Sequence, residues 1–398
     1  MNYARRLRMM LLALAALTFA MLAFNFIVNP YGAWCHRVVG NVYYRLRGGG
    51  HERVMTPYRL RTTTPTTVLL GTSRVVFGMP IEQGYKDGFL NAGLSAARPE
   101  EIGKEVRLAL KNPGLKRFIW AVDFFTFDER LKCVPDTCAR LDGSIRLLIL
   151  DNLLSSEALD SGWHLLGRAL SGRGALDRKA LEPIPWPQDY ICERFKTQAG
   201  RGLGNVGENG ALQQILSETP LYKGSLCCSA GIASFRGNVE AIKRAGRELI
   251  VFVPPMTQYE LEEIRQSGLW PRFQQFKRDL TASVSYWDFS GYNRIARTDT
   301  MFLDVVHMKP EVGMTILRRL LGMPDSQCHE MQIVLDSALQ VSAENIDAVQ
   351  ALQEQRERAA NAEPNKYAQV VARAISEGGE DWAAAVAASG SGATGPSR

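Results

Sequence analysis

Residues 66–74, with the sequence Thr-Thr-Val-Leu-Leu-Gly-Thr-Ser-Arg, decide the fold. The first five are β-branched or apolar, which is typical of a strand buried on both faces, as in a parallel sheet. Gly71 ends this strand, and Ser73 follows in what we expect to be a strand-to-helix turn. Open parallel sheets bind ligands outside the carboxyl ends of their strands. Ser73 is therefore expected at the edge of the sheet where a functional site would lie.

The chain on either side of this segment alternates expected strands with expected helices. Strands are expected at 89–90, 116–122, 248–253 and 284–289, and helices at 99–110, 234–245, 260–280 (interrupted near Gly268) and 310–321. Such alternation predicts an α/β fold with a mainly parallel sheet and helices on both faces.

The rest of the chain has other patterns. We expect a cytoplasmic N-terminus and membrane anchor (1–28), a polar connector (29–64), a core (65–128 and 231–322), an insertion or cap (129–230) and a tail (323–398). The tail is expected to contain a helix at 342–360 and then a disordered Ala/Gly/Ser stretch at 383–398.

The N-terminus contains a candidate transmembrane helix. Arginines at 5, 6 and 8 precede Met9–Val28, whose only polar residues are Thr18 and Asn25. Twenty residues at about 1.5 Å each are long enough to span a bilayer. A cleaved signal peptide and the buried helix of a soluble protein are the alternatives. Large residues at the end of the apolar run, with no small-residue cleavage site, favour an uncleaved anchor.

The position of the arginines predicts the orientation of the anchor. By the positive-inside rule, residues 30–398 lie across the membrane. In a bacterium the protein would then be held in the inner membrane, with its C-terminal part in the periplasm or outside the cell.

The composition limits the classes of protein to which the chain can belong. The chain has 398 residues, of which 46% are hydrophobic, so global disorder is excluded. The formal net charge is +6; residues 330–398 carry −5 and the rest +11. The sequence has no Lys/Arg cluster with interleaved aromatic residues of the kind that indicates a nucleic-acid site.

The seven cysteines fit an oxidising compartment. Cys133 and Cys138 enclose a short loop and are a candidate disulfide, and Cys192 could reach Cys227 or Cys228. Several cysteines as buried apolar residues are the alternative. No Cys/His set has zinc spacing, so no metal is expected.

Two segments carry the residues for nucleophilic chemistry: the turn that contains Ser73, and a segment just before the last expected helix. Asp304-Val-Val-His307 places a carboxylate where it can accept from the Nδ1–H of the histidine, which leaves Nε2 to take a proton from a serine. The alternatives are structural: Ser73 as a helix N-cap, and Asp304 as a cap beside a surface histidine.

Asn91-Ala-Gly93 follows the second expected strand, where a glycine lets the backbone approach a substrate oxygen closely. An ordinary tight turn is the alternative for this segment.

These three segments together resemble the SGNH/GDSL hydrolase superfamily, and most closely its membrane-anchored members such as the DltD-like and alginate O-acetylation proteins. The resemblance implies a three-layer α/β/α, flavodoxin-like fold without a cofactor. It implies Ser73 as nucleophile, His307 as base, Asp304 as its orienting acid, and the N–H groups of Ser73 and Gly93 as the oxyanion hole. One departure is Asp123, which stands where the family has an oxyanion-donating Asn; an ionised carboxylate would repel an oxyanion.

The expected function is therefore a membrane-anchored esterase or O-acyltransferase acting on envelope or secreted polysaccharide, beside a membrane-bound acyltransferase. Arg74, Asn91 and Asp123 are candidate substrate contacts, although Arg74 is also expected as a solvated side chain. Trp163, Trp186 and Trp270 could stack on sugars or pack in the protein. The alternatives are an inactive protein of this fold that binds glycan or a membrane partner, and a lipase or thioesterase held at the membrane.

Overall fold

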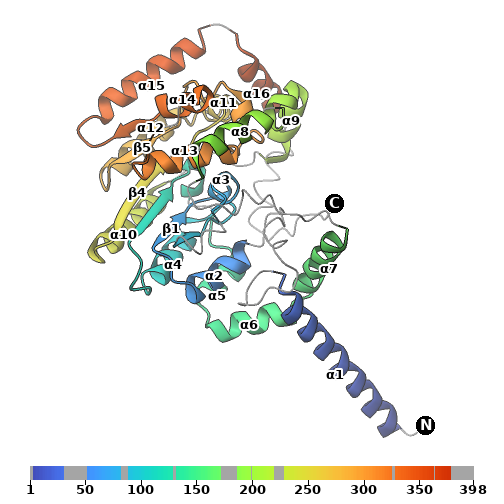
Figure 1. Ribbon diagram of the computed structural model, residues 1–398. Helices are drawn as coiled ribbons and strands as arrows, with labels where there is room; N and C mark the ends of the chain where they lie inside the picture. Colours follow the sequence, from blue (N-terminus) through green and yellow to red (C-terminus); the bar gives the residue numbers. More distant parts are fainter. Residues whose placement is uncertain are drawn as a thin grey trace. The chain divides into compact units, whose positions relative to one another are not determined.

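The computed structural model of the chain (Figure 1) describes residues 3–30, 52–81, 88–128, 131–171, 186–198, 200–218, 228–324, 328–362 and 364–377. The chain forms two compact units. The first consists of Met1–Thr63 and Pro135–Glu182, and the second of Thr64–Val134 and Pro183–Arg398.

The second unit is built on one six-stranded sheet with the order β2-β1-β3-β4-β5-β6. The strands are β1 (Thr67–Leu70), β2 (Phe89–Asn91), β3 (Arg117–Ala121), β4 (Glu248–Val253), β5 (Tyr286–Asp288) and β6 (Leu339–Val341). All neighbours pair in parallel except β5 and β6, which are antiparallel. The predicted α/β class with a mainly parallel sheet is confirmed. The first five strands follow the order of flavodoxin-like sheets, which places the topological switch point between β1 and β3.

Helices pack against both faces of this sheet, since side chains alternate between the faces and are buried on both, as in β1 and β3. On one face Trp120 of β3 contacts Phe235 of α10 (Ser229–Arg244), with ring centroids 4.8 Å apart, and α4 (Pro99–Ala109) packs on α10. Ile119, on the other face, belongs to the core cluster that includes Val312 of α13 (Pro310–Leu320). Because both faces of these strands are buried, their sequences are continuous apolar runs and do not alternate between apolar and polar residues.

The remaining helices of the second unit are α3 (Ser73–Gly78), α8 (Gln188–Gln198), α9 (Gly207–Glu218), α11 (Gln258–Gln266), α12 (Trp270–Thr281), α14 (His329–Asp336), α15 (Ile346–Ala360) and α16 (Lys366–Glu377). The expected tail helix is thus α15. A buried network fixes it to the sheet: Lys277 Nζ lies 2.9 Å from both Asp288 Oδ2 and Gln353 Oε1. The low-complexity stretch 383–398 lies outside the described residues.

The first unit is helical in its described part. It contains α1 (Tyr3–Val28), α2 (Glu52–Thr62), α5 (Pro135–Asp142), α6 (Ile145–Leu154) and α7 (Ser156–Leu170). Helix α1 is long and apolar enough to span a membrane, and only 11% of its most apolar window is buried. The polar connector expected at 29–64 includes α2. The residues expected as one insertion, 129–230, are divided between the units, since α5–α7 belong to the first and α8 and α9 to the second.

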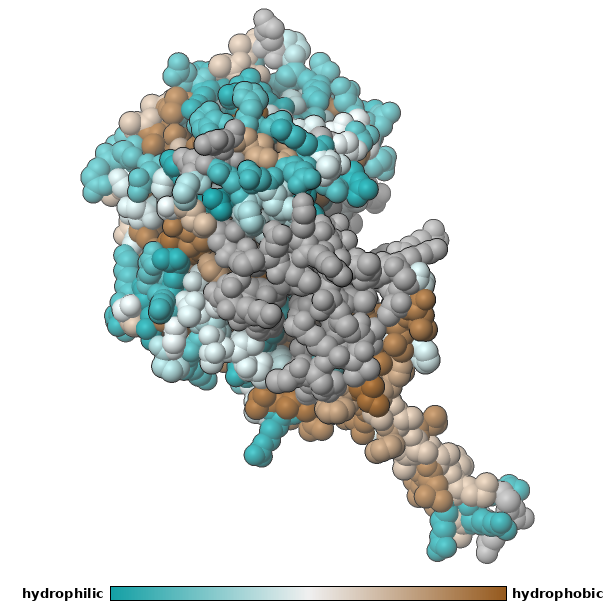
Figure 2. Space-filling model, viewed as in Figure 1, coloured by the Kyte–Doolittle hydropathy of each residue, from teal (hydrophilic) through white to brown (hydrophobic). Residues whose placement is uncertain are grey.

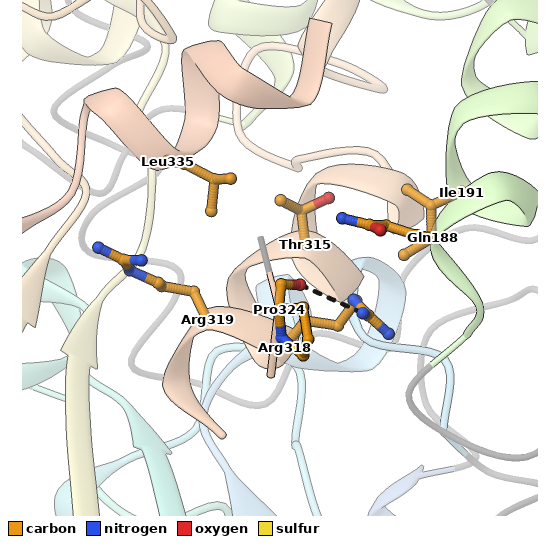
Figure 3. Close-up of a pocket in the computed structure, with 7 residues that line it drawn as sticks. All are labelled: Gln188, Ile191, Thr315, Arg318, Arg319, Pro324 and Leu335. Carbon is orange, nitrogen blue, oxygen red and sulfur yellow. Dashed lines mark hydrogen bonds between the residues drawn. The ribbon is translucent and has the colours of Figure 1, made fainter. Parts of the chain in front are cut away.

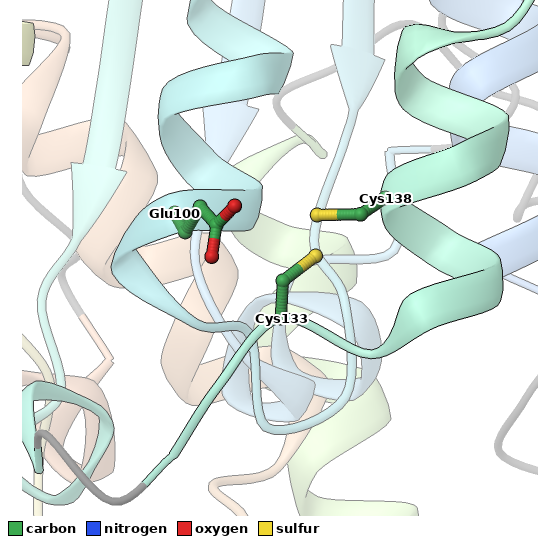
Figure 4. A group of neighbouring side chains, drawn as sticks. All are labelled: Glu100, Cys133 and Cys138. Carbon is green, nitrogen blue, oxygen red and sulfur yellow. The ribbon is translucent and has the colours of Figure 1, made fainter.

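Cys133 and Cys138 are disulfide-bonded. Figure 4 shows their sulfur atoms facing each other. Sulfur atoms that are oxidised in this way offer no thiolate to a metal ion. Cys227 lies outside the described residues, and Cys192 hydrogen-bonds with Cys328. Burial is the larger cause, and this hydrogen bond the next, of the rise in the pKa of the Cys328 thiol to about 12.

Candidate active site

Ser73 is presented by the turn that joins β1 to α3. Gly71 has a φ of +153°, and a Cβ there would lie 2.6 Å from Val75 Cγ2 and 2.9 Å from Ala121 Cβ, so only glycine fits. Thr72 is the N-cap, and its Oγ1 accepts from the N–H of Arg74 at 3.3 Å. The N-cap role proposed as an alternative for Ser73 therefore belongs to Thr72. Ser73 is the first helical residue and remains partly exposed.

Asp304 and His307 share one loop between β5 and α13. Asp304 Oδ1 accepts from the backbone N–H groups of Val306 at 2.9 Å and His307 at 2.7 Å. His307 Nδ1 lies 3.0 Å from Oδ1 and 2.9 Å from Oδ2 of the same carboxylate. The carboxylate thus holds both the loop and the imidazole ring.

His307 Nε2 lies 2.8 Å from Ser73 Oγ, although the two residues are 234 positions apart in the sequence. Because Nδ1 is directed at Asp304, it carries the donated proton, and Nε2 is left as the acceptor for the Ser73 hydroxyl. The ring of Phe77 packs edge-on against the imidazole with centroids 5.1 Å apart. The three expected residues therefore meet as a Ser–His–Asp relay at the carboxyl edge of the sheet.

The surroundings of Asp304 favour its charged form. Partial burial raises the pKa of this carboxyl, but the hydrogen bond and charge of His307, with the N–H groups of His307 and Val306, outweigh that effect. The pKa of Asp304 therefore lies below its ordinary value. A carboxylate that stays ionised is able to stabilise an imidazolium.

The helices that follow the two halves of the relay are in very close contact. A Cβ on Gly313 of α13 would lie 1.9 Å from the carbonyl oxygen of Gly78, the last residue of α3. Met308 lies in the same contact, since a Cβ on Gly78 would meet its side chain at 2.7 Å. This packing sets the distance between the Ser73 turn and the His307 loop.

The second-strand loop lies beside the Ser73 turn, but its glycine is engaged. A Cβ on Gly93 would lie 3.2 Å from the carbonyl oxygen of Thr72, which shows how near the two loops are. The Gly93 N–H, however, donates to Asn91 Oδ1 at 2.9 Å. The N–H that the resemblance implies as an oxyanion donor is therefore engaged by Asn91 in this structure. Ser73, whose own N–H makes no hydrogen bond within the described residues, is the remaining donor of the expected pair.

Asn91 is a buried residue that connects backbone segments, not a surface contact for substrate. Its Nδ2 donates to the carbonyl oxygens of Val75 and Met79, both at 2.9 Å. The amide thus fixes the helix that begins at Ser73 to the end of β2. Strand-end position alone could not reveal this, because it does not show which way the amide turns.

Arg74 and Asp123 are also buried, with 1% and 4% of their surface exposed. Arg74 Nε lies 2.9 Å from Asp123 Oδ1, its Nη2 pairs with Glu260, and its Nη1 donates to the carbonyl of Pro255 at 2.7 Å. Asp123 also accepts from the Thr72 hydroxyl. The expectation that Arg74 is solvated or steers a polymer is wrong, and Asp123 is an acceptor that cannot replace an oxyanion-donating Asn.

Two small hollows in the second unit do not include the relay. One is lined by Gly71, Thr72, Asp123 and mainly apolar neighbours at the ends of β1 and β3. The other, in Figure 3, is lined by α8, α13 and α14, with Arg318 donating to the Pro324 carbonyl at 3.2 Å.

Trp186 and Trp270 pack against Tyr190 and Phe273, as the packing alternative predicted.

Comparison of the sequence with models of known protein families finds no match, and no curated protein matches it either.

Proposed function

We propose that the protein is a serine esterase or O-acyltransferase that uses Ser73, His307 and Asp304. The observation that carries this proposal is the 2.8 Å contact between Ser73 Oγ and His307 Nε2, with Asp304 on the other ring nitrogen. A hydroxyl at a strand-to-helix turn, an acceptor imidazole and an ionised carboxylate are the parts that acyl transfer requires.

The chemistry proceeds in two steps. Ser73 Oγ attacks the ester carbonyl as its proton moves to His307 Nε2, and the leaving alcohol then takes that proton, which gives an acyl-Ser73 intermediate. Water or a sugar hydroxyl then attacks the acyl group while giving its proton to Nε2, and the proton returns to Ser73. The N–H of Ser73 supports the oxyanion, and the N–H of Gly93 joins it only after exchanging the Asn91 oxygen for the substrate.

We also propose that the chain is a divergent, anchored member of the SGNH/GDSL superfamily. The strand order and the placement of the three residues at the carboxyl edge support this. Helix α1 would anchor the protein in the inner membrane with residues 30–398 in the periplasm, and the substrate would be an envelope or secreted polysaccharide. A membrane-bound acyltransferase is the partner that this arrangement suggests.

A fluorophosphonate probe tests the nucleophile directly. We expect the full-length protein in detergent to be labelled at Ser73 and to hydrolyse p-nitrophenyl acetate, and Ser73→Ala to lose both activities. Ser267→Ala, which removes an exposed serine at the end of α11, is the matched control and should retain both. A folded wild-type protein that is not labelled would contradict the proposal.

One observation favours a second candidate, a non-catalytic protein that binds glycan or a membrane partner. The expected oxyanion donors are reduced, since Gly93 N–H is engaged by Asn91 and Asp123 accepts from the Thr72 hydroxyl. Removing one such donor costs about 2.7–4 kcal/mol of transition-state stabilisation in a serine hydrolase. Retained binding of a polysaccharide by Ser73→Ala, together with no labelling of the wild type, would favour this candidate.

A further inference from the structure

The first unit has an exposed apolar surface that the relay does not explain. Three leucines of α6, Leu147, Leu150 and Leu154, are 63%, 51% and 48% exposed, and Trp163 of α7 is 62% exposed. Spacings of three and four place the leucines on one side of α6. Figure 2 shows a hydrophobic band over α6 that continues along α1. Contiguous exposed apolar surface of this kind marks an interaction site.

This surface is fixed to the C-terminal end of α1. Asn25, one of two polar residues in the apolar run, donates from Nδ2 to the carbonyl oxygens of Leu153 at 3.0 Å and Ser155 at 3.1 Å. The end of α6 is thus tied to the last turn of α1. Figure 1 shows α6 leaving this end of α1 crosswise, not running alongside it.

Helix α7 is fixed to the same end. The ring of Phe24 lies 5.1 Å from that of Trp163, and a Cβ on Gly162 would lie 2.5 Å from Phe24, so the two helices approach closely only because residue 162 is glycine. Val28 and Leu165 form a small buried cluster beside this contact. The exposed indole of Trp163 is therefore held where α1 ends.

The polar groups of α6 are compatible with an interfacial position. Leu148 and Asn152 are buried on the side opposite the exposed leucines, so that side faces the other helices of the first unit. Asp151, at the flank of the leucine face, pairs with Arg140 Nε at 2.9 Å, and Arg146 is exposed to the other side. Charged groups at the edge of an apolar face can reach the headgroups while the leucines enter the boundary with the acyl chains.

We propose that α6 and Trp163 form a second membrane contact, lying in the interfacial layer of the bilayer in which α1 is anchored. The inference rests on the anchoring role proposed for α1 and is independent of the catalytic proposal. A helix that leaves the end of a spanning helix crosswise lies at the level of the membrane surface, and its exposed leucines lie opposite the buried side of α6. Tryptophan is enriched at this depth. Continuity with the apolar surface of α1 favours lipid over a protein partner as the occupant.

The test uses the full-length chain in phosphatidylcholine vesicles, with an environment-sensitive fluorescent amino acid encoded at one position at a time. The positions are Leu150 on α6, Leu14 on α1 and, as a control, the exposed Gln275 on α12. Quenching is measured with lipids that carry a spin label either near the headgroup or near the methyl end of the acyl chain. We expect position 150 to be quenched most by the shallow label, position 14 by the deep label, and position 275 by neither.

The outcomes separate the two claims. Deep quenching at position 14 without quenching at position 150 overturns the surface contact and leaves the anchor intact. No quenching at position 14 overturns both. A probe at position 150 that is unquenched in vesicles but shielded in native membranes would show that a membrane protein covers the leucines, and would also overturn the lipid contact. Leu147→Glu with Leu154→Glu should abolish shallow quenching at position 150 without changing position 14.

Discussion

The carbonyl oxygen of Gly78 occupies the space where Gly313 would carry a side chain, with 1.9 Å between that oxygen and a Cβ at position 313. Gly78 ends the helix that begins at Ser73, and Gly313 lies in the helix that follows His307. The separation of nucleophile and base is therefore set by two residues without side chains.

Replacing Gly313 with alanine should force α3 and α13 apart. We expect Gly313→Ala to lower the free energy of unfolding by about 1–3 kcal/mol, the usual range for an overpacked core, and to reduce probe labelling of Ser73. Denaturant titration and labelling rates are the measurements. Gly237→Ala is the matched control, because Gly237 lies in a helix with no atom within 4 Å of the added Cβ and alanine favours helices. Equal behaviour of the two variants would contradict the packing argument.

The buried charges beneath Ser73 depend on Arg74. Arg74→Met removes the positive partner of Asp123 and Glu260 and leaves two buried carboxylates, which we expect to lower the unfolding free energy by about 3–5 kcal/mol. An Arg74→Met, Asp123→Asn double variant should recover part of this loss, because one buried charge is removed. The measurement is a double-mutant cycle by denaturant titration. Strictly additive losses would show that the pair is not coupled.

Substitutions of Asn91 test which way its side-chain amide points. Asn91→Ala loses the bonds to Val75 and Met79, for a cost of about 1–3 kcal/mol. Asn91→Asp should be less stable than Asn91→Ala, since it turns a carboxylate oxygen toward the same two carbonyls. Thermal melts at neutral pH rank the three proteins. An aspartate variant as stable as the wild type would mean that the amide points the other way.

The contribution of Asp304 to stability should depend on pH. Its pKa is lower in the folded chain than its ordinary value, so the folded state holds the charged form more strongly than the unfolded state does. That stability is fully present above the ordinary aspartate pKa of about 3.9 and is lost as pH falls through the folded value. The difference in unfolding free energy between wild type and Asp304→Asn should shrink below that pH. A difference that grows in acid would contradict the sign.

The sequence predicted the sheet better than the parts around it. Buried runs such as Val68–Leu70 predicted strands because both faces of a parallel sheet are apolar, and the Asp304/His307 spacing predicted their pairing within one loop. Strand β6 escaped prediction, since three residues that pair antiparallel at an edge carry no long apolar run. The roles of Arg74 and Asn91 escaped prediction for another reason. Their burial is set only by the fold, and partners such as Glu260 are distant in the sequence.

The central claim is that Ser73 becomes acylated because His307 accepts its proton. The most direct measurement is peptide mass spectrometry of the full-length protein after brief exposure to p-nitrophenyl acetate and an acid quench. The account predicts an acetyl group on the peptide that contains Ser73, at a level strongly reduced in His307→Gln and absent from Ser73→Ala. A folded wild-type protein without acetyl-Ser73, or equal acetylation in His307→Gln, would contradict it.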